Sequence, residues 1–388
     1  MTEMVHGTLP ATAGEPVLSR WWRTVDRWTI SCVLLLFAVG LLLSLASTPP
    51  LAARNNLSAF YYFNRQAAFG VVAILIMLGV SMMSPAAIRR WAVLGWAASM
   101  LLLLALPFVG TDFGKGAVRW LSLGFTSVQP SEFLKPALVV ATAWMLAAAL
   151  EPNGPPGKIM SLAVTGAAVA LLVIQPDFGQ AALVMFAWGV MYFVSGAAML
   201  VIMVLAGLVA LGGVFAYGRS EHFARRIDGF LSSEIDARSQ LGYATSAIQE
   251  GGLFGLGVGE GQVKWHLPDA HTDFIIAVAA EEYGFLLVLV IIALYATICL
   301  RALMRLSRER DAFARIAGTG LAALVSAQAF INMGVAARLL PAKGMTLPLV
   351  SYGGSSLIAM GLLLGMLLAL TRARPQGELG AILRARGG

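Results

Sequence analysis

The stretch from Trp265 to Glu282, WHLPDAHTDFIIAVAAEE, gathers titratable side chains in a chain that has few of them. Two His and two Asp come first, and an apolar run with two adjacent Glu follows. A carboxylate at the start of a helix can act as a general base, or it can simply cap the helix. Because a long, basic and glycine-rich segment precedes it, we take Asp273 as the candidate catalytic carboxylate, at the mouth of a cavity.

The two glutamates of this stretch have different positions on the expected helix. Glu281 would lie about 80° from Asp273 around the axis and about 12 Å deeper, so it could face the same cavity. Glu282 would point nearly opposite to Asp273 and pack elsewhere, and a structural role is the alternative for both glutamates. The His and Asp residues before the run could also be metal ligands, but their H-x4-H spacing fits no zinc signature on a helix.

The composition is that of a membrane protein. Charged residues make up 12% of the 388 positions and hydrophobic residues 59%, with a mean hydropathy of +0.79. A soluble domain carries about 25% charged residues, so we predict an all-α polytopic membrane protein. Cys32 and Cys299 lie in apolar runs, which excludes a disulfide framework or a zinc ribbon. The net charge of +7 indicates loops that face anionic lipid, not nucleic acid.

A membrane-spanning helix needs about 20 apolar residues. Ten segments qualify: 29–48, 67–86, 91–110, 131–150, 159–174, 180–196, 197–218, 273–300, 314–337 and 355–372. The distribution of Lys and Arg places both termini on the cytoplasmic side, so that 1–28 and 373–388 are cytoplasmic tails of a single domain, 29–372. The long loop 219–272, between the seventh and eighth spans, is then outside. Many basic residues remain on that side, which predicts an anionic ligand there.

Two parts of the long loop have recognisable patterns. Apolar residues at helical spacing between 223 and 231 predict an amphipathic helix at the membrane interface. The run GGLFGLGVGEG, from Gly251 to Gly261, lacks the strand and helix that would surround a dinucleotide loop. We therefore expect tightly turning backbone that folds back over the bundle.

Charged residues at membrane depth usually face a cavity or a partner. Glu132 and Lys135 are three apart on one helix face, and for them an internal ion pair is favoured over catalysis. Asp177 lies between Pro176 and Gly179, where a capped turn is favoured over a catalytic role.

Two further groups lie near the expected membrane surfaces. Lys115 and Arg119 belong to an outer loop, where solvation and contact with an anionic ligand explain them equally well. Trp120 beside them fits an interfacial aromatic residue or a member of the same ligand site. The motif VDRW at 25–28 is explained as an anchor at the inner interface, and we assign it no chemistry.

The segment LLPAKGMTLPLVSYGGSS at 339–356 is rich in residues that turn or end a helix. It predicts re-entrant backbone, which is tolerated at membrane depth only where protein or water covers it. Lys343 is the sole cation of this part, and it either reaches the surface or pairs with a carboxylate across the cavity. Ser351 and Ser355 are polar candidates for lining that cavity or supporting its backbone.

Seven motifs of this chain resemble those of the SEDS family of shape, elongation, division and sporulation proteins, which includes FtsW, RodA and SpoVE. They occur in family order from the first span to the last: VDRW at 25–28, RWLSLG at 119–124, QPSEFLKPAL at 129–138, QPDFG at 175–179, GGLFGLGVG at 251–259, LPDAHTDFIIAVAAEEYGF at 267–285 and LPAKGMTLPLVSYGGSS at 340–356. The Lys-Gly-Met-Thr form at 343–346 is similar to the FtsW branch. Ser239-Gln240 and Tyr243 depart from the family, which usually shows two glutamines three apart there.

The resemblance implies a peptidoglycan glycosyltransferase. Such proteins polymerise lipid II, a disaccharide–pentapeptide on undecaprenyl pyrophosphate, into nascent glycan at the outer face of the bacterial cytoplasmic (inner) membrane. They work with a class B penicillin-binding protein and, in the FtsW branch, with other division proteins at the septum. By that resemblance Asp273 is the essential carboxylate and Lys343 its ion-pair partner. A lipid II transporter, a RodA-like elongation polymerase and a non-catalytic scaffold are the alternatives.

The implied reaction gives the candidate residues their roles. Asp273 would take the proton from the acceptor 4-hydroxyl while its oxygen attacks the anomeric carbon, without a covalent intermediate. Lys343 would lower the pKa of Asp273, and desolvation would raise it. The pyrophosphate would be held by Lys115, Arg119 and either Lys264 or Arg238. No tightly bound cofactor is expected, although a divalent cation, Mg or Mn, could accompany the pyrophosphate.

Overall fold

The computed structural model describes residues 16–111, 118–124, 126–219, 221–231, 239–341 and 344–373. Within these ranges the strands are a single short pair, β1 (Leu121–Ser122) and β2 (Ser127–Val128). The helices are α1 (Val17–Thr24), α2 (Arg27–Ser47), α3 (Pro49–Arg54), α4 (Tyr61–Ser81), α5 (Pro85–Val109), α6 (Pro130–Ala148), α7 (Gly157–Ile174), α8 (Phe178–Val194), α9 (Met199–Arg219), α10 (Glu221–Leu231), α11 (Gln240–Gly251), η1 (Val263–Trp265), α12 (Ile275–Leu306), α13 (Ala312–Ala336) and α14 (Gly354–Leu370). The predicted all-α class is confirmed.

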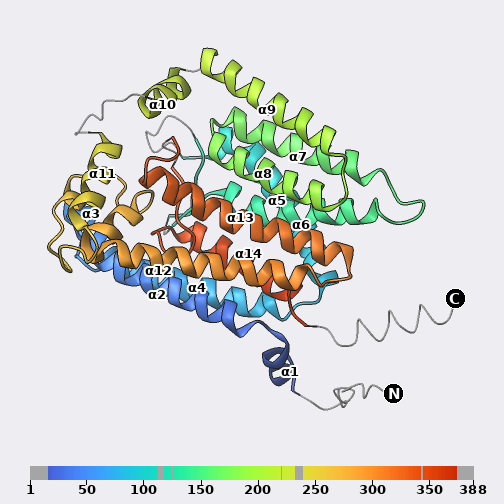
Figure 1. Ribbon diagram of the computed structural model, residues 1–388, viewed down its shortest axis with the longest axis horizontal. Coiled ribbons are helices and arrows are strands. Elements are labelled where there is room, and N and C mark those ends of the chain that lie inside the picture. The colour runs from blue at the N-terminus through green and yellow to red at the C-terminus, as the bar shows by residue number, and fades with distance from the viewer. Residues whose placement is uncertain are drawn as a thin grey trace.

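Among the described helices, eight are long and apolar enough to cross a membrane, and two shorter apolar helices, α8 and α14, accompany them. Each of the ten segments expected from the sequence falls on one of these helices. They form a bundle in which α1 and the last turns of α12 and α14 lie at one end, hereafter the α1 end (Figure 1). The helices α3 and α11 lie at the opposite end, hereafter the α11 end.

Small residues let the helices of the bundle approach each other closely. Gly361 and Gly365 of α14 face the backbone of α4, where an added Cβ would lie 2.3 Å from the carbonyl oxygen of Ala73 and 2.8 Å from that of Met77. Lipid tails are as apolar as leucine, so close packing of this kind is a main source of attraction between helices in a membrane.

Two spans begin earlier than expected, and a third ends later, since α12 runs to Leu306 and not to residue 300. The segments expected at 67–86 and 91–110 are α4 and α5, and each helix begins six residues earlier than expected, at Tyr61 and Pro85. Ser84 explains the second boundary, because its Oγ accepts a hydrogen bond from the backbone N–H of Ala87 at 3.2 Å. Pro85 then occupies the first helical position. A serine cap followed by proline is a strong start signal that a hydropathy window does not detect.

The helix α12 is broken at Gly284, whose φ of 79° and ψ of 179° are open essentially only to glycine. The glycine-rich run folds back over the bundle, as predicted, and it completes the broken helix. The carbonyl oxygen of Gly252 accepts from Phe285 N at 2.9 Å, and Leu256 N donates to the carbonyl oxygen of Glu281 at 2.9 Å. The loop therefore supplies partners for backbone groups that the break would leave unpaired.

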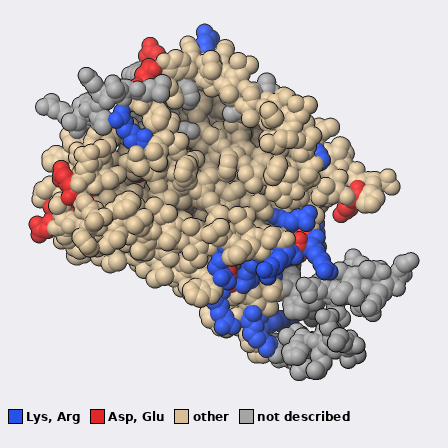
Figure 2. Space-filling model, viewed as in Figure 1, with Lys and Arg blue, Asp and Glu red and all other residues tan. Residues whose placement is uncertain are grey.

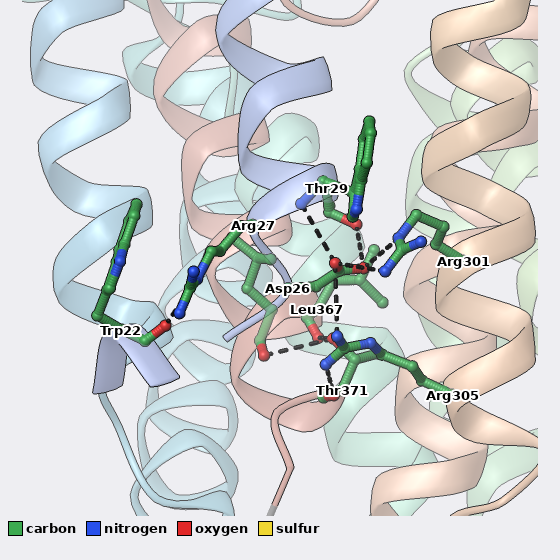
Figure 3. Close-up of polar contacts among 10 residues, drawn as sticks. Trp22, Asp26, Arg27, Thr29, Arg301, Arg305, Leu367 and Thr371 are labelled. Carbon is green, nitrogen blue, oxygen red and sulfur yellow. Dashed lines mark hydrogen bonds and ion pairs between the residues drawn. The ribbon is translucent and has the colours of Figure 1, made fainter. Parts of the chain in front are cut away.

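Basic side chains gather at the α1 end (Figure 2). There Asp26 is 2% exposed and accepts hydrogen bonds from Arg301 at 2.8 and 2.9 Å, with Arg305 3.4 Å away (Figure 3). Arg305 also donates to the carbonyl oxygen of Thr371 at 3.2 Å, so the start of α2 is joined to the ends of α12 and α14. Burial acts to raise the pKa of Asp26, but hydrogen bonds from Arg301 and Thr29 and the charge of Arg305 outweigh it and hold that pKa below its ordinary value.

Candidate active site

Asp273 lies in the turn that precedes α12, at the α11 end of the bundle. Its backbone N–H donates to the carbonyl oxygen of Asp269 at 3.0 Å, and its own carbonyl oxygen accepts from Asn332 Nδ2 at 3.0 Å. Its carboxylate faces Gly344, where an added Cβ would lie 3.1 Å from Asp273 Oδ2. The carboxylate is thus next to the segment that carries Lys343. Lys343 itself lies outside the described residues, so the expected ion pair stays a prediction.

The re-entrant segment, residues 344–353, is fastened to the turn that contains Asp273. Ser351 Oγ accepts from Leu347 N at 2.8 Å and donates to the carbonyl oxygen of Thr272 at 2.5 Å. Tyr352 N donates to the carbonyl oxygen of His271 at 2.9 Å. These bonds satisfy irregular backbone inside a helical bundle, as such backbone requires, and they fix the position of the turn.

Two amides of α13 hold the same segment from the other side. Gln328 Nε2 donates to the carbonyl oxygen of Thr346 at 3.0 Å, and Asn332 Nδ2 donates to that of Met345 at 2.6 Å. Sequence reasoning missed both amides. Their i, i+4 spacing in an apolar helix is the signal that could have revealed them. Ser355, the other predicted serine, is 4% exposed at the start of α14.

The ion pair predicted between Glu132 and Lys135 is present. Lys135 Nζ lies 2.9 Å from Glu132 Oε2, and the side chains are 2% and 5% exposed. Gln328 Oε1 accepts a second hydrogen bond from Lys135 at 2.9 Å, and Gln180 Nε2 donates to Glu132 Oε1 at 2.7 Å. Both buried charges therefore have the additional partners that such a pair needs. Through Gln328 this network reaches the re-entrant segment beside Asp273.

Arg119 contacts the turn between α7 and α8. Its Nε donates to the carbonyl oxygen of Gln175 at 3.2 Å, and its Nη2 donates to that of Pro176 at 2.8 Å. Asp177, at the N-cap position of α8, is 8% exposed and accepts from Gln129 Nε2 at 3.2 Å. Burial raises the pKa of Asp177, and the charge of Arg119 acts against that rise. These are supporting contacts, and the contact of Arg119 with an anionic ligand stays a prediction.

Lys264, expected to hold a pyrophosphate, is buried in an ion pair instead. Its ammonium group contacts the carboxylate of Glu282, and the two side chains are 4% and 0% exposed. Glu281 accepts from the backbone N–H groups of Val263 at 2.7 Å and Lys264 at 3.3 Å. Of the two roles expected for Glu281, lining the cavity of Asp273 or supporting the structure, these contacts favour the structural one. Both glutamates bind the loop before α12, because that loop wraps over the helix and reaches both side chains.

Three predicted ligand-binding residues remain, namely Lys115, Trp120 and Arg238. Lys115 and Arg238 lie outside the described residues. Trp120 is partly buried, and its carbonyl oxygen accepts from Thr111 N at 2.8 Å. In the part of the chain that the structure describes, no group of three or more His, Cys, Asp or Glu side chains is arranged to hold a metal ion.

The fold and the site together define a polytopic helical membrane protein with a carboxylate held between a broken helix and a re-entrant segment. The family described as "Cell cycle protein", which comprises FtsW, RodA and SpoVE, matches residues 26–376. The chain belongs to this family, which confirms the resemblance seen in the motifs. It is 43% identical over 372 residues to the "Probable peptidoglycan glycosyltransferase FtsW" of Caulobacter vibrioides, covering 96% of this chain and 95% of that relative.

Two solved structures have the same fold. One, described as "Structural coordination of polymerization and crosslinking by a peptidoglycan synthase complex", has a TM-score of 0.73 and 28% identity and covers 89% of this chain and 97% of its own. The other is the rod shape determining protein RodA of Thermus thermophilus, with a TM-score of 0.66, 27% identity, and coverage of 90% and 97%.

Proposed function

We propose that this chain is a peptidoglycan glycosyltransferase that polymerises lipid II into glycan strands during cell division. The observation that carries the proposal is 43% identity, over nearly the whole chain, to a relative that bears the name of this activity. The site supports it, because hydrogen bonds from Asn332, Ser351 and Tyr352 hold the turn containing Asp273. A carboxylate fixed in this way suits proton transfer at a positioned hydroxyl group.

In the proposed reaction Asp273 accepts the proton of the acceptor 4-hydroxyl while that oxygen attacks the donor's anomeric carbon. The bond from this carbon to the pyrophosphate oxygen breaks, and undecaprenyl pyrophosphate leaves with the electron pair. The configuration at the anomeric carbon inverts, so no enzyme nucleophile is required. We assign Lys343 as the ion-pair partner of Asp273 and Lys115 as a pyrophosphate ligand, with a Mg or Mn ion accompanying the pyrophosphate.

We place the α1 end in the cytoplasm and the α11 end outside the inner membrane, with the septum as the working position. The basic side chains gathered at the α1 end support this orientation, because cytoplasmic segments carry an excess of basic residues (Figure 2). We further propose a class B penicillin-binding protein as the partner. The similar structure from a peptidoglycan synthase complex supports that choice.

The test is polymerisation of labelled lipid II by the purified chain with its penicillin-binding partner. Asp273→Asn should abolish polymer. Asp269→Asn is the matched control, since Asp269 has a φ of 54° that asparagine also tolerates, and it should keep most of the activity. Polymer from a folded Asp273→Asn protein would defeat the proposal. Lipid II movement across liposomes without polymer would favour a transporter, and loss of septal localisation alone would favour a scaffold.

A further inference from the structure

A row of aromatic rings lies at the α11 end, next to the turn that contains Asp273. Tyr61 and Tyr62 open α4, and their ring centroids are 5.2 Å apart. Tyr352 of the re-entrant segment follows at 5.4 Å from Tyr62, and His271 lies 5.8 Å from Tyr352. The row begins at Tyr61, which is 38% exposed, and it ends two residues before Asp273.

The row is held in place by polar contacts with its surroundings. Asn55 Nδ2 donates to Tyr62 Oη at 3.1 Å, and the Arg65 guanidinium lies 5.7 Å from the ring centroid of Tyr61. Gln66 Nε2 donates to the carbonyl oxygen of Val350 at 3.1 Å, which joins α4 to the re-entrant segment. The rings are therefore fixed relative to Asp273.

An interfacial belt is the ordinary explanation for tyrosines at the end of a membrane helix. Belt residues contact lipid headgroups and need no fixed relation to each other. Here the rings come from three separate segments, and they include a histidine of the turn that contains Asp273. The tyrosine pairs stand edge to face, with 89° between the ring planes, and His271 is tilted by 55° against Tyr352. Tyr62, His271 and Tyr352 are each only partly exposed, so the row lies at the surface of the protein near the site.

We infer that this row binds the sugar rings of the glycan substrate and leads the acceptor saccharide to Asp273. The inference rests on the proposed function. A pyranose has an apolar C–H face that packs on an aromatic ring, while phenol and guanidinium groups bond to its hydroxyl and amide groups. The contribution of the row is to bind the saccharide, and the lipid and pyrophosphate are bound elsewhere.

The experiment measures binding of a soluble, lipid-free glycan strand to the full chain in nanodiscs, in an Asp273→Asn background that prevents turnover. Tyr352→Leu and Tyr61→Leu should each weaken binding about three- to tenfold, because one stacking contact is lost. Tyr352→Phe keeps the ring and should bind nearly as the parent does. The matched control is Phe108→Leu, which replaces an aromatic residue that is 87% exposed near the end of α5.

Equal binding by both leucine variants and the control would overturn the inference and leave the rings as a membrane anchor. If Tyr352→Leu does not fold, Tyr61→Leu decides, since its side chain is exposed. Failure of the proposed function would be seen in a different experiment, as polymer formation by the Asp273→Asn protein without any change in the aromatic row. In active protein the leucine variants should also produce shorter glycan strands, and the control should not.

Discussion

The buried pair of Lys264 and Glu282 allows a direct test of whether this lysine is structural or binds substrate. Their side chains are 4% and 0% exposed, so neither charge has much contact with water. Glu282→Gln leaves the ammonium group of Lys264 buried without its counter-charge. Removing one partner of a buried pair costs about 3–5 kcal/mol. We expect Glu282→Gln and Lys264→Met each to lose stability on this scale.

The double variant should lose much less stability than the sum of the two single variants. It leaves no unpaired charge, and the glutamine can still accept the hydrogen bond that Gly259 N donates to Glu282. The expected coupling is about 2–3 kcal/mol. Equilibrium unfolding in mixed micelles measures all four proteins. Glu260→Gln, an exposed carboxylate in the same loop, is the control and should be nearly neutral.

A second readout separates the two roles of Lys264. If it held the pyrophosphate, Lys264→Met would keep the parent stability and raise the lipid II concentration needed for half-maximal rate. That result, or simple additivity in the double variant, would refute the structural role.

Three more outcomes follow from the structure. In an equilibrium unfolding assay, Gly284→Ala should destabilise the protein by more than about 3 kcal/mol, since the φ of Gly284 is 79° and the new Cβ would lie 2.3 Å from a carbonyl oxygen. Gly79→Ala is the control and should be nearly neutral, because the space around Gly79 is open. The pKa of Asp26 is lowered in the folded protein, so its pair with Arg301 should stabilise the protein fully at pH values above 3.8, the ordinary pKa of an aspartate. As the pH falls below 3.8, the difference in unfolding free energy between the parent and Asp26→Asn should shrink. EDTA should slow polymerisation reversibly without changing the melting temperature, because the proposed Mg or Mn ion accompanies the pyrophosphate of the substrate; a lowered melting temperature would contradict this.

Local properties of the sequence were sufficient for part of this architecture. Hydropathy located the apolar helices, and the spacing of Glu132 and Lys135 predicted their ion pair, because helix geometry relates residues three apart. The glycine spacing also predicted a loop that returns to the bundle. The early start of α5 was missed because the cap at Ser84 depends on residue identity, which an average over a window removes.

The partner of Lys264 could not be predicted in the same way. As a basic residue in an outer loop it resembles an anion ligand. Its contact, Glu282, is 18 residues away and is reached only after the loop folds onto α12. The break at Gly284 was equally hidden, since one glycine in an apolar run is compatible with an unbroken helix. Both features depend on packing between segments, which periodicity does not describe.

The break in α12 also divides this helix into a short first part next to Asp273 and a long second part. The part after Gly284 runs to Leu306, roughly 33 Å at 1.5 Å per residue. That length alone matches a hydrocarbon core of about 30 Å. The first turns of α12, next to Asp273, are therefore not needed for crossing, and the loop sets their position. A thicker or thinner bilayer changes the tilt of a crossing helix, and we expect Gly284 to let the crossing part tilt while the loop holds the first turns beside Asp273.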